Sequence, residues 1–182
     1  MARTTREDWI DAGLTLLRES GEHALTLDRL CAALGRTKGS FYHHFAGMPE
    51  LSRALLEAWE QRHTEVPIAT ASREDNIGKR RKLLDASVKQ LDWALDLTVR
   101  AWALRDASAR DTVARVDARR IDYLESLLPR RVSAARRRAI ATLEYAAFLG
   151  AMQLDPMRTR GDEARSEALL YEALGGLIGS KR

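Results

Sequence analysis

Apolar residues recur along this chain at the spacing of amphipathic helices, and the pattern is clearest in residues 27–34. Leucines and one cysteine lie there at positions i, i+3, i+4 and i+7, which places them on one face of a helix. Thr26 stands just before this face as a candidate N-cap. Gly35 follows it, where glycine favours the left-handed backbone of a helix C-terminus. The pattern therefore predicts a short helix that ends in a tight turn.

A second short helix is predicted directly after this turn, over Thr37–His44. Phe41 and Phe45 are four residues apart and mark its buried side. Its opposite face carries Lys38, Gly39, Ser40, Tyr42, His43 and His44. A helix-turn-helix presents its second helix to the major groove of DNA in this way, so residues 26–45 indicate a DNA-binding motif.

Helices are also predicted on both sides of this pair. The first covers Thr5–Ser20, and Thr5 with Asp8 three residues later forms a candidate capping pair. The fourth begins near Met48 and tolerates Pro49 in its first turn. We expect it to end before Pro67, because proline disfavours helical backbone in the residue that precedes it.

The rest of the chain is predicted to be helical as well, which makes the fold class all-α with about nine helices. The polar stretch between Pro67 and Gly78 is expected to be a connection or the start of a loose helix. We expect a helix-turn-helix domain over residues 1–47 and a larger helical domain over residues 48–182. The further helices are predicted at Lys79–Asp96, Leu97–Asp106, Ala107–Leu128, Ser133–Leu154 and Asp162–Ile178.

The charge of the chain supports DNA binding only through its local distribution. The net charge is +4 over 182 residues, and the first 47 residues hold as many acidic as basic side chains. From Arg29 to Pro49, however, there are three basic residues and no acidic one. Arg3 and Arg6 are expected to form a basic N-terminal arm. Because phosphates respond to local charge, the recognition surface is predicted to be basic.

Composition argues against several other protein classes. Cys31 is the only cysteine, so no intramolecular disulfide can form; it lies on an apolar stripe and is expected to be a core residue. The N-terminus lacks the apolar segment of a signal peptide. The longest near-apolar run, Tyr145–Leu154, is far shorter than the roughly 20 residues of a membrane span. We therefore expect a cytoplasmic protein.

Nothing in the sequence indicates an enzyme. There are only four histidines, and no glycine-rich phosphate loop, metal-ligand spacing or nucleophile turn is present. Adjacent residues on a helix point about 100° apart, so His43 and His44 are not expected to hold one metal ion. We expect no catalysis, no cofactor and no metal.

The motif resembles the DNA-binding segment of the tetracycline-repressor-like (TetR/AcrR) family of bacterial regulators. That segment has an amphipathic helix, a glycine turn, a recognition helix of small residues with a following tyrosine, and then an aromatic residue. The resemblance covers roughly the first fifty residues, and the segment Arg100–Leu104 is also similar. It is carried here by Leu27–Leu34, Gly35, Thr37–Ser40, Tyr42, Phe45 and Leu51.

The resemblance implies a ligand-responsive homodimeric repressor that binds a palindromic operator. It implies a backbone contact for Tyr42, whereas the alternative for this residue is a packing aromatic. Lys38 suits a phosphate or a guanine edge, and its alternative is a solvated lysine. Of the two histidines, His44 is favoured as the contact. The full set of expected DNA-binding residues is Thr26, Arg29, Thr37, Lys38, Gly39, Ser40, Tyr42, His43 and His44.

One position departs from the family pattern. Family members usually carry a lysine that clamps a phosphate at the start of the fourth helix, and this chain has Met48 there. The resemblance therefore implies weaker or more arm-dependent binding, with Arg3 and Arg6 as compensating charges.

The resemblance implies that residues 48–182 form an effector-binding and dimerisation domain, and the broad apolar faces of the last two helices also favour a partner. An apolar or aromatic effector is expected to contact Trp93, Trp102, Tyr145, Phe148 and Met152, although aromatics and methionines at helical spacing also suit a plain core. The last two helices are expected to pair two copies, although their apolar faces could instead be buried within one protomer. The expected interface residues are Leu143, Ala147, Ala151, Leu170, Leu174 and Leu177.

An arginine cluster precedes and opens the helix at 133–154 and opposes its dipole. We expect a solvated face that is paired with acids such as Glu125 across the dimer; a site for an acidic ligand or a membrane surface is the weaker interpretation. Its members are Arg130, Arg131, Arg136, Arg137 and Arg138. The alternative function for the whole chain is a helical dimeric scaffold or ligand-binding protein that does not read DNA.

Overall fold

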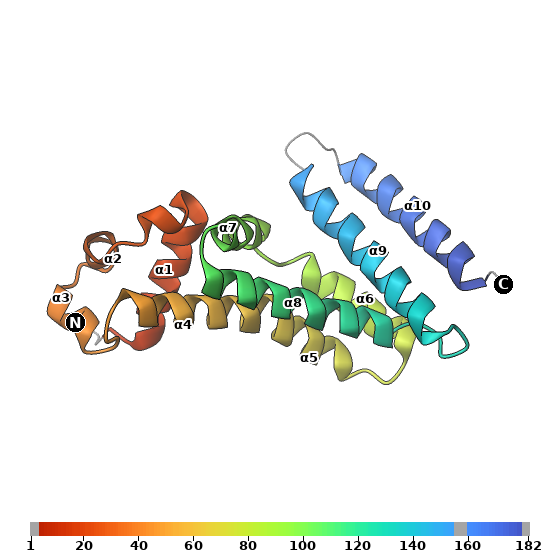
Figure 1. Cartoon of the computed structure of the whole chain (residues 1–182), viewed down its shortest axis with the longest axis horizontal. Helices are drawn as coiled ribbons and strands as arrows, with labels where there is room; N and C mark the ends of the chain where they lie inside the picture. The colour runs from red at the N-terminus through yellow and green to blue at the C-terminus, as the bar shows by residue number, and fades with distance from the viewer. Residues whose placement is uncertain (1–3, 155–159, 180–182) are drawn as a thin grey trace. The chain divides into compact units, whose positions relative to one another are not determined.

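The structure is a computed structural model that describes residues 4–154 and 160–179. Within these ranges the chain forms ten α-helices and no strand (Figure 1). The predicted all-α fold class is confirmed. None of the helices in the described ranges combines the length and the apolar character that a membrane crossing requires.

The chain divides into two compact units, Met1–Val116 and Asp117–Arg182. The first unit contains the helix-turn-helix segment and several further helices. The last long helix of the first unit, α8 (Ala107–Ser126), continues into the second. The expected functional boundary between residues 47 and 48 lies within the first unit and stays a prediction.

Helix α1 (Arg6–Ser20) begins with a complete capping box. The Thr5 hydroxyl accepts a hydrogen bond from the Asp8 N–H at 3.2 Å, and the Asp8 carboxylate accepts one from the Thr5 N–H at 2.7 Å. These bonds satisfy backbone donors that a helix N-terminus otherwise leaves unpaired. The capping pair and the first helix are thus found where the sequence predicts them.

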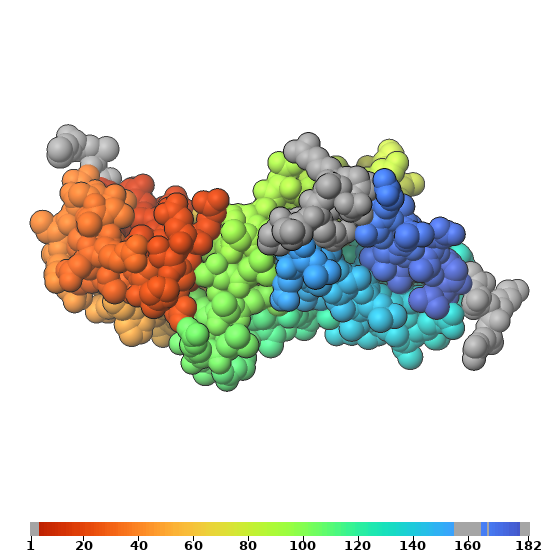
Figure 2. Space-filling model, turned by 90° about the horizontal axis from the view of Figure 1, so that it is seen from above, coloured from red at the N-terminus to blue at the C-terminus, as the bar shows by residue number. Residues whose placement is uncertain are grey.

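Three elements after α1 complete the head of the first unit. Helix α2 (Leu27–Leu34) matches its predicted range, whereas α3 (Lys38–Tyr42) ends two residues earlier than predicted. His43 and His44 continue in a turn. Helix α4 (Met48–Glu60) follows, and Pro49 lies in its first turn as predicted. Figures 1 and 2 place α3 at the end of this unit that is farthest from α6 (Ile77–Val88).

Large aromatic and aliphatic side chains form the core of the head. Trp9 and Phe41 are fully buried and meet edge to face, with ring centroids 5.4 Å apart. Phe41 also stacks on Phe45 at 5.5 Å. Burial of each such side chain stabilises the fold by about 2–3 kcal/mol. These contacts hold α3 against α1, so the position of the recognition helix is set by the core.

Helix α4 ends at Glu60, before Pro67 as predicted, but helical backbone continues past this end. A π-helical turn at Gln61–Glu65 leads directly into α5 (Val66–Ser72). The Val66 N–H bonds to the Gln61 carbonyl, so a new helical segment begins and Pro67 lies in its first turn. No N–H is needed there, because the first turn of a helix lacks intrahelical acceptors for its donors.

The predicted helices at 79–96 and 97–106 are divided at the wrong place. The chain forms α6 up to Val88 and α7 over Trp93–Ala103, with a turn between them. Asp92 accepts a hydrogen bond from the Leu95 N–H at 3.2 Å and caps α7. Aspartate competes with helical backbone bonds and favours this capping position.

The second unit consists of the end of α8, α9 (Ala134–Gln153) and α10 (Arg160–Gly179), and α9 and α10 lie side by side (Figure 1). Ser133 caps α9 through the Arg136 N–H, close to the predicted start. The predicted connection between these helices lies largely outside the described residues. The core of this unit is formed by Leu128, Val132, Ile140, Ala141 and Leu174.

Candidate nucleic-acid interface

The turn between α2 and α3 is built from local backbone chemistry. Thr26 caps α2 by accepting a bond from the Arg29 N–H at 3.4 Å, and Thr37 caps α3 by accepting one from the Ser40 N–H at 3.4 Å. Gly35 adopts φ 60° and ψ 40°, the left-handed conformation that glycine adopts without steric strain. These three residues fix the angle between the two helices.

The outer side of α3 presents the predicted residues to solvent. Tyr42 is 58% exposed, although its neighbour Phe41 is fully buried. Lys38, Gly39, Thr37 and His43 are also exposed. Ser40 and His44 are half-buried, and Thr26 and Arg29 are exposed on α2. A packing role for Tyr42, which was the alternative, does not agree with this exposure.

Two arginines of this region are anchored to α1. The Arg29 guanidinium donates a hydrogen bond to the Ser20 hydroxyl at 3.2 Å. The Arg36 guanidinium donates one to the Thr4 hydroxyl. Their charges are therefore held near the α2–α3 turn.

Arg6 does not belong to a free arm, so that expectation is wrong. It is the first residue of α1, and its guanidinium lies over the Phe45 ring, 4.7 Å from the centroid. It also lies 3.8 Å from the Glu50 carboxylate. The cation–π contact and the carboxylate account for this position. Arg3, the other expected member of the arm, lies outside the described residues.

Lys38 forms an ion pair that the charge pattern did not indicate. Its ammonium lies 2.7 Å from the Asp28 carboxylate on the first turn of α2. The hydrogen bond and the charge of Asp28 raise the pKa of Lys38. The acid-free stretch that suggested a basic surface begins one residue after Asp28. A count that started one residue earlier would have found this carboxylate.

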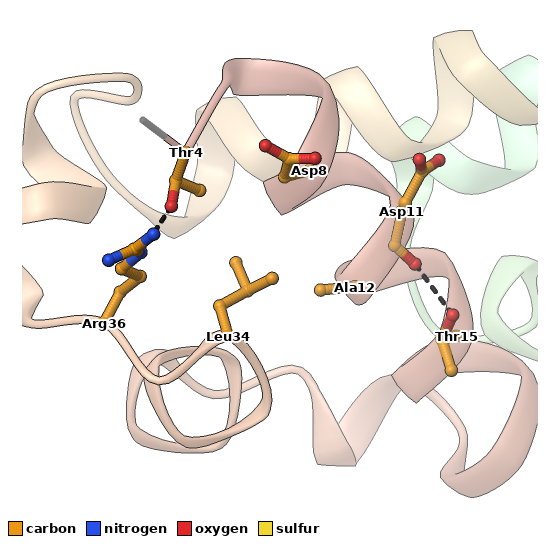
Figure 3. Close-up of a pocket in the computed structure, with 7 residues that line it drawn as sticks. All are labelled: Thr4, Asp8, Asp11, Ala12, Thr15, Leu34 and Arg36. Atoms are coloured by element: carbon orange, nitrogen blue, oxygen red, sulfur yellow. Dashed lines mark hydrogen bonds between the residues drawn. The ribbon is translucent and has the colours of Figure 1, made fainter. Parts of the chain in front are cut away.

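A groove of about 430 Å³ lies between α1 and the end of α2. Figure 3 shows residues from one face of α1 opposite Leu34 and Arg36. Hydrogen bonds from the Thr5 backbone and hydroxyl lower the pKa of Asp8, which is therefore ionised at neutral pH. The Asp11 carboxylate lies 2.7 Å from the Arg62 guanidinium. Two carboxylates repel phosphates, so this groove does not belong to the candidate DNA surface.

Met48 packs against the core of the head and is half-buried. The Ala46 N–H donates to the Glu50 carboxylate at 2.7 Å, which stabilises the start of α4. The methionine side chain therefore contributes to packing at this helix start and offers no charge for a phosphate.

Comparison with known proteins identifies the head. Residues 10–55 match the sequence model of the family described as bacterial regulatory proteins, tetR family. A transcriptional repressor of the helix-turn-helix type from Mycobacterium tuberculosis is 35% identical over 88 residues, which cover 48% of this chain and 44% of the relative. The regulator TtgR of Pseudomonas putida is 33% identical over 85 residues, which cover 46% of this chain and 40% of the relative. Residues 10–55 therefore carry the sequence pattern of this family. The matched segment spans less than half the length of either relative.

Solved structures extend the likeness of fold to the rest of the chain. A TetR transcriptional regulator from Legionella pneumophila superposes with a TM-score of 0.70 at 16% identity, covering 97% of this chain and 96% of that one. The multidrug binding protein EbrR, complexed with imidazole, gives 0.65 at 21% identity, covering 100% and 98%. At these identities the likeness shows the fold alone.

The expected effector residues are divided between the two compact units. Trp93 and Trp102 lie on α7 in the first unit. Trp93 is half-buried, and Trp102 is 6% exposed. Tyr145, Phe148 and Met152 lie on α9 in the second unit. The Tyr145 hydroxyl donates to Asp117 at 2.6 Å, and its ring stacks on Phe148 at 6.4 Å. A common cavity for all five residues stays a prediction.

The expected dimer residues fall into two groups. Leu143 and Ala147 are exposed, and Leu177 is 39% exposed. Ala151 and Leu170 are half-buried. Leu174 is 5% exposed and packs in the core of the second unit. This residue joins α10 to α9 within one protomer, and its assignment to the dimer interface stays a prediction.

Three arginines of the cluster have partners within the chain. Arg136 donates two hydrogen bonds, at 3.0 and 2.8 Å, to the Leu177 carbonyl near the end of α10. Arg137 donates to the Val132 carbonyl at 2.7 Å. Arg138 bonds to Asp122, and both Arg137 and Arg138 lie 3.7 Å from the Glu125 carboxylate. Glu125 therefore pairs with this cluster within one protomer, and the expected pairing across the dimer is not needed. Arg130 and Arg131 are exposed.

Proposed function

We propose that this chain is a sequence-specific transcriptional regulator of the TetR family. In this proposal it acts in the cytoplasm as a homodimer and represses transcription from a palindromic operator. The observation that supports it most strongly is the division of α3 into two sides. Phe41 and Phe45 are 0% and 1% exposed and hold the helix, while Tyr42 is 58% exposed and free to meet a ligand. This is the arrangement that a recognition helix requires. The proposal includes no catalytic step.

In this proposal the residues around α3 divide their roles. Tyr42 and the hydroxyls of Thr26, Thr37 and Ser40 contact phosphates, and they set the register of the protein on the duplex. The remaining contacts come from Arg29, Lys38, Gly39, His43 and His44. Lys38 is the residue best suited to a base edge, since lysine donates to guanine O6 and N7.

We propose that two protomers pair through the free faces of α9 and α10. On α9 the exposed residues Leu143, Ala146, Ala147, Gly150 and Leu154 lie at i, i+3, i+4, i+7 and i+11, which is one helix face. On α10, Leu169 is 66% exposed and Leu177 is 39% exposed. Small residues allow helix axes to approach closely, and apolar faces of this extent favour a partner.

A small apolar or aromatic molecule is the proposed effector. One supporting observation is that EbrR, which has the same fold, is described as a multidrug binding protein and was crystallised with malachite green. An effector that drives almost complete release must favour the non-binding conformation by about 5 kcal/mol.

The experiment that tests this function measures binding to a duplex from the promoter of the chain's own gene, with non-specific competitor present. Tyr42→Phe removes one phosphate hydrogen bond, and Lys38→Ala removes one base contact. Each is expected to weaken binding about 5- to 150-fold without a change in thermal stability. Lys82→Ala, an exposed lysine on α6, is the matched control and should bind as the parent protein does. Unchanged affinity in both head variants would favour the alternative, a helical dimeric scaffold or ligand-binding protein without DNA readout.

A further inference from the structure

The Asp28–Lys38 ion pair joins the exposed surfaces of α2 and α3. Its Nζ–Oδ1 distance is 2.7 Å, and the two side chains are 78% and 60% exposed, respectively. The pair contributes little to stability, because exposed ion pairs are worth about 0–1 kcal/mol. Its position on the candidate DNA surface therefore calls for a different explanation.

The Asp28–Lys38 ion pair presents a hydrogen-bond donor, the Lys38 ammonium, beside an acceptor, the Asp28 carboxylate. In the major groove a G·C pair presents the matching set, with O6 and N7 of guanine as acceptors and the N4 amino group of cytosine as donor. O6 and N4 are themselves hydrogen-bonded, so they lie about 2.9 Å apart. The spacing of the two protein atoms is close to this value. Lysine can donate to guanine while aspartate accepts from cytosine.

A carboxylate on this surface is unfavourable for contacts to phosphate. DNA presents one negative charge per about 1.7 Å of helix axis, and a carboxylate near it is repelled. The charge of Asp28 is acceptable on a DNA-binding face only where it meets a hydrogen-bond donor. The amino group of cytosine is such a donor.

We propose that Asp28 is a specificity-determining residue, and that it and Lys38 read one G·C base pair in each half-site as a unit. This inference rests on the proposed DNA-binding function. It adds a residue that sequence reasoning did not select, and it predicts that both side chains act on the same base position.

The test is selection of bound duplexes from a random library, followed by affinity measurements on the selected site. The parent protein is expected to enrich G·C at one position in each half-site. Asp28→Ala and Lys38→Ala should each lose the preference at that same position and keep it at all others. Affinity for the selected site should fall about 5- to 150-fold in each variant. The double variant should lose less than the product of the two single effects, because the pair acts together.

Asp122→Asn is the matched control. It removes one carboxylate from another exposed ion pair, that with Arg138 in the second unit, and should leave every base preference unchanged. Thermal unfolding of each variant shows whether the fold is retained. Asp28→Asn serves as a second variant, because it keeps the size of the side chain and removes only the charge.

Three outcomes would overturn the inference. Asp28 variants could keep all base preferences, or they could alter a position other than the one that Lys38→Ala alters. They could also change affinity equally for every duplex, which would mean that Asp28 acts through charge alone. Each of these leaves the proposed function standing, provided that the parent protein enriches a site. A parent protein that enriches no duplex overturns both the function and the inference.

Discussion

Gly13 lies where α1 packs against α4. The Leu55 side chain of α4 is so close that a residue with a Cβ would not fit without a shift. A Cβ at this position would lie 2.7 Å from Leu55 Cδ2 and 3.1 Å from Cδ1. Leu55 is 1% exposed, so the packed core leaves it little room to move. Gly39 on α3 is different, because its nearest neighbour would be the Thr37 hydroxyl at 3.8 Å, an ordinary contact.

These two glycines predict opposite effects of alanine on stability. Gly13→Ala should destabilise the protein by about 1 kcal/mol, since overpacking costs about 1–3 kcal/mol and the gain in helix propensity offsets part of it. Gly39→Ala should stabilise it by up to about 1 kcal/mol. Urea unfolding without DNA measures both values. A Gly13→Ala protein more stable than its parent would contradict the close contact with Leu55.

Met48→Lys tests the one departure from the family pattern. The aliphatic part of lysine can replace the packing of methionine, while the ammonium reaches solvent. We expect tighter DNA binding and a dependence of log K on log salt that is steeper by about 0.9, the value for one additional phosphate contact. Affinity measured across a salt series gives this slope. An unchanged slope would mean that the start of α4 lies away from the DNA backbone.

At the scale of elements, N-capping residues mark where several of the helices begin. Sequence reasoning found the caps at Thr5 and Thr26, because each residue directly precedes an apolar stripe. It missed Asp92, which caps α7 within what reads as one continuous stripe. Periodicity reports which face is apolar, and it does not report a helix that stops and restarts in nearly the same phase.

Arg136→Ala is expected to destabilise the packing of α10 on α9. The change removes two hydrogen bonds to the Leu177 carbonyl and a positive charge near the C-terminus of α10. The loss should be about 1 kcal/mol, with faster amide hydrogen exchange in α10. Arg131→Ala, an exposed arginine of the same cluster, is the control and should change neither value. Equal effects of the two variants would contradict the capping role.

At the scale of the whole molecule, the sequence predicted the all-α class and the helix-turn-helix segment of the head. This segment could be predicted because its short helices carry their own caps, turn glycine and aromatic core. The proposed dimer face is harder to predict, since the stripe on α10 contains both Leu177, which is exposed, and Leu174, which is buried against α9. An apolar stripe cannot indicate which of its residues faces its own chain and which faces a second copy.

Leu143→Glu and Leu174→Ala separate the dimer face from the core. Leu143 is 55% exposed, so Leu143→Glu should give monomers in sedimentation while the helical content is kept. Leu174→Ala should instead destabilise the second unit by about 2–5 kcal/mol, the usual loss for a buried leucine. Intact dimers of the Leu143→Glu protein would place the interface elsewhere.

The docking of α3 in the major groove is tested most directly by hydroxyl-radical footprinting on the promoter duplex. The account predicts two protected groups of sugars related by two-fold symmetry, with centres about one helical turn, roughly 34 Å, or a multiple of it apart. The protection should be lost in Tyr42→Phe and Lys38→Ala at concentrations at which the parent protein protects fully. A parent protein that protects no duplex above competitor at low salt would contradict the account.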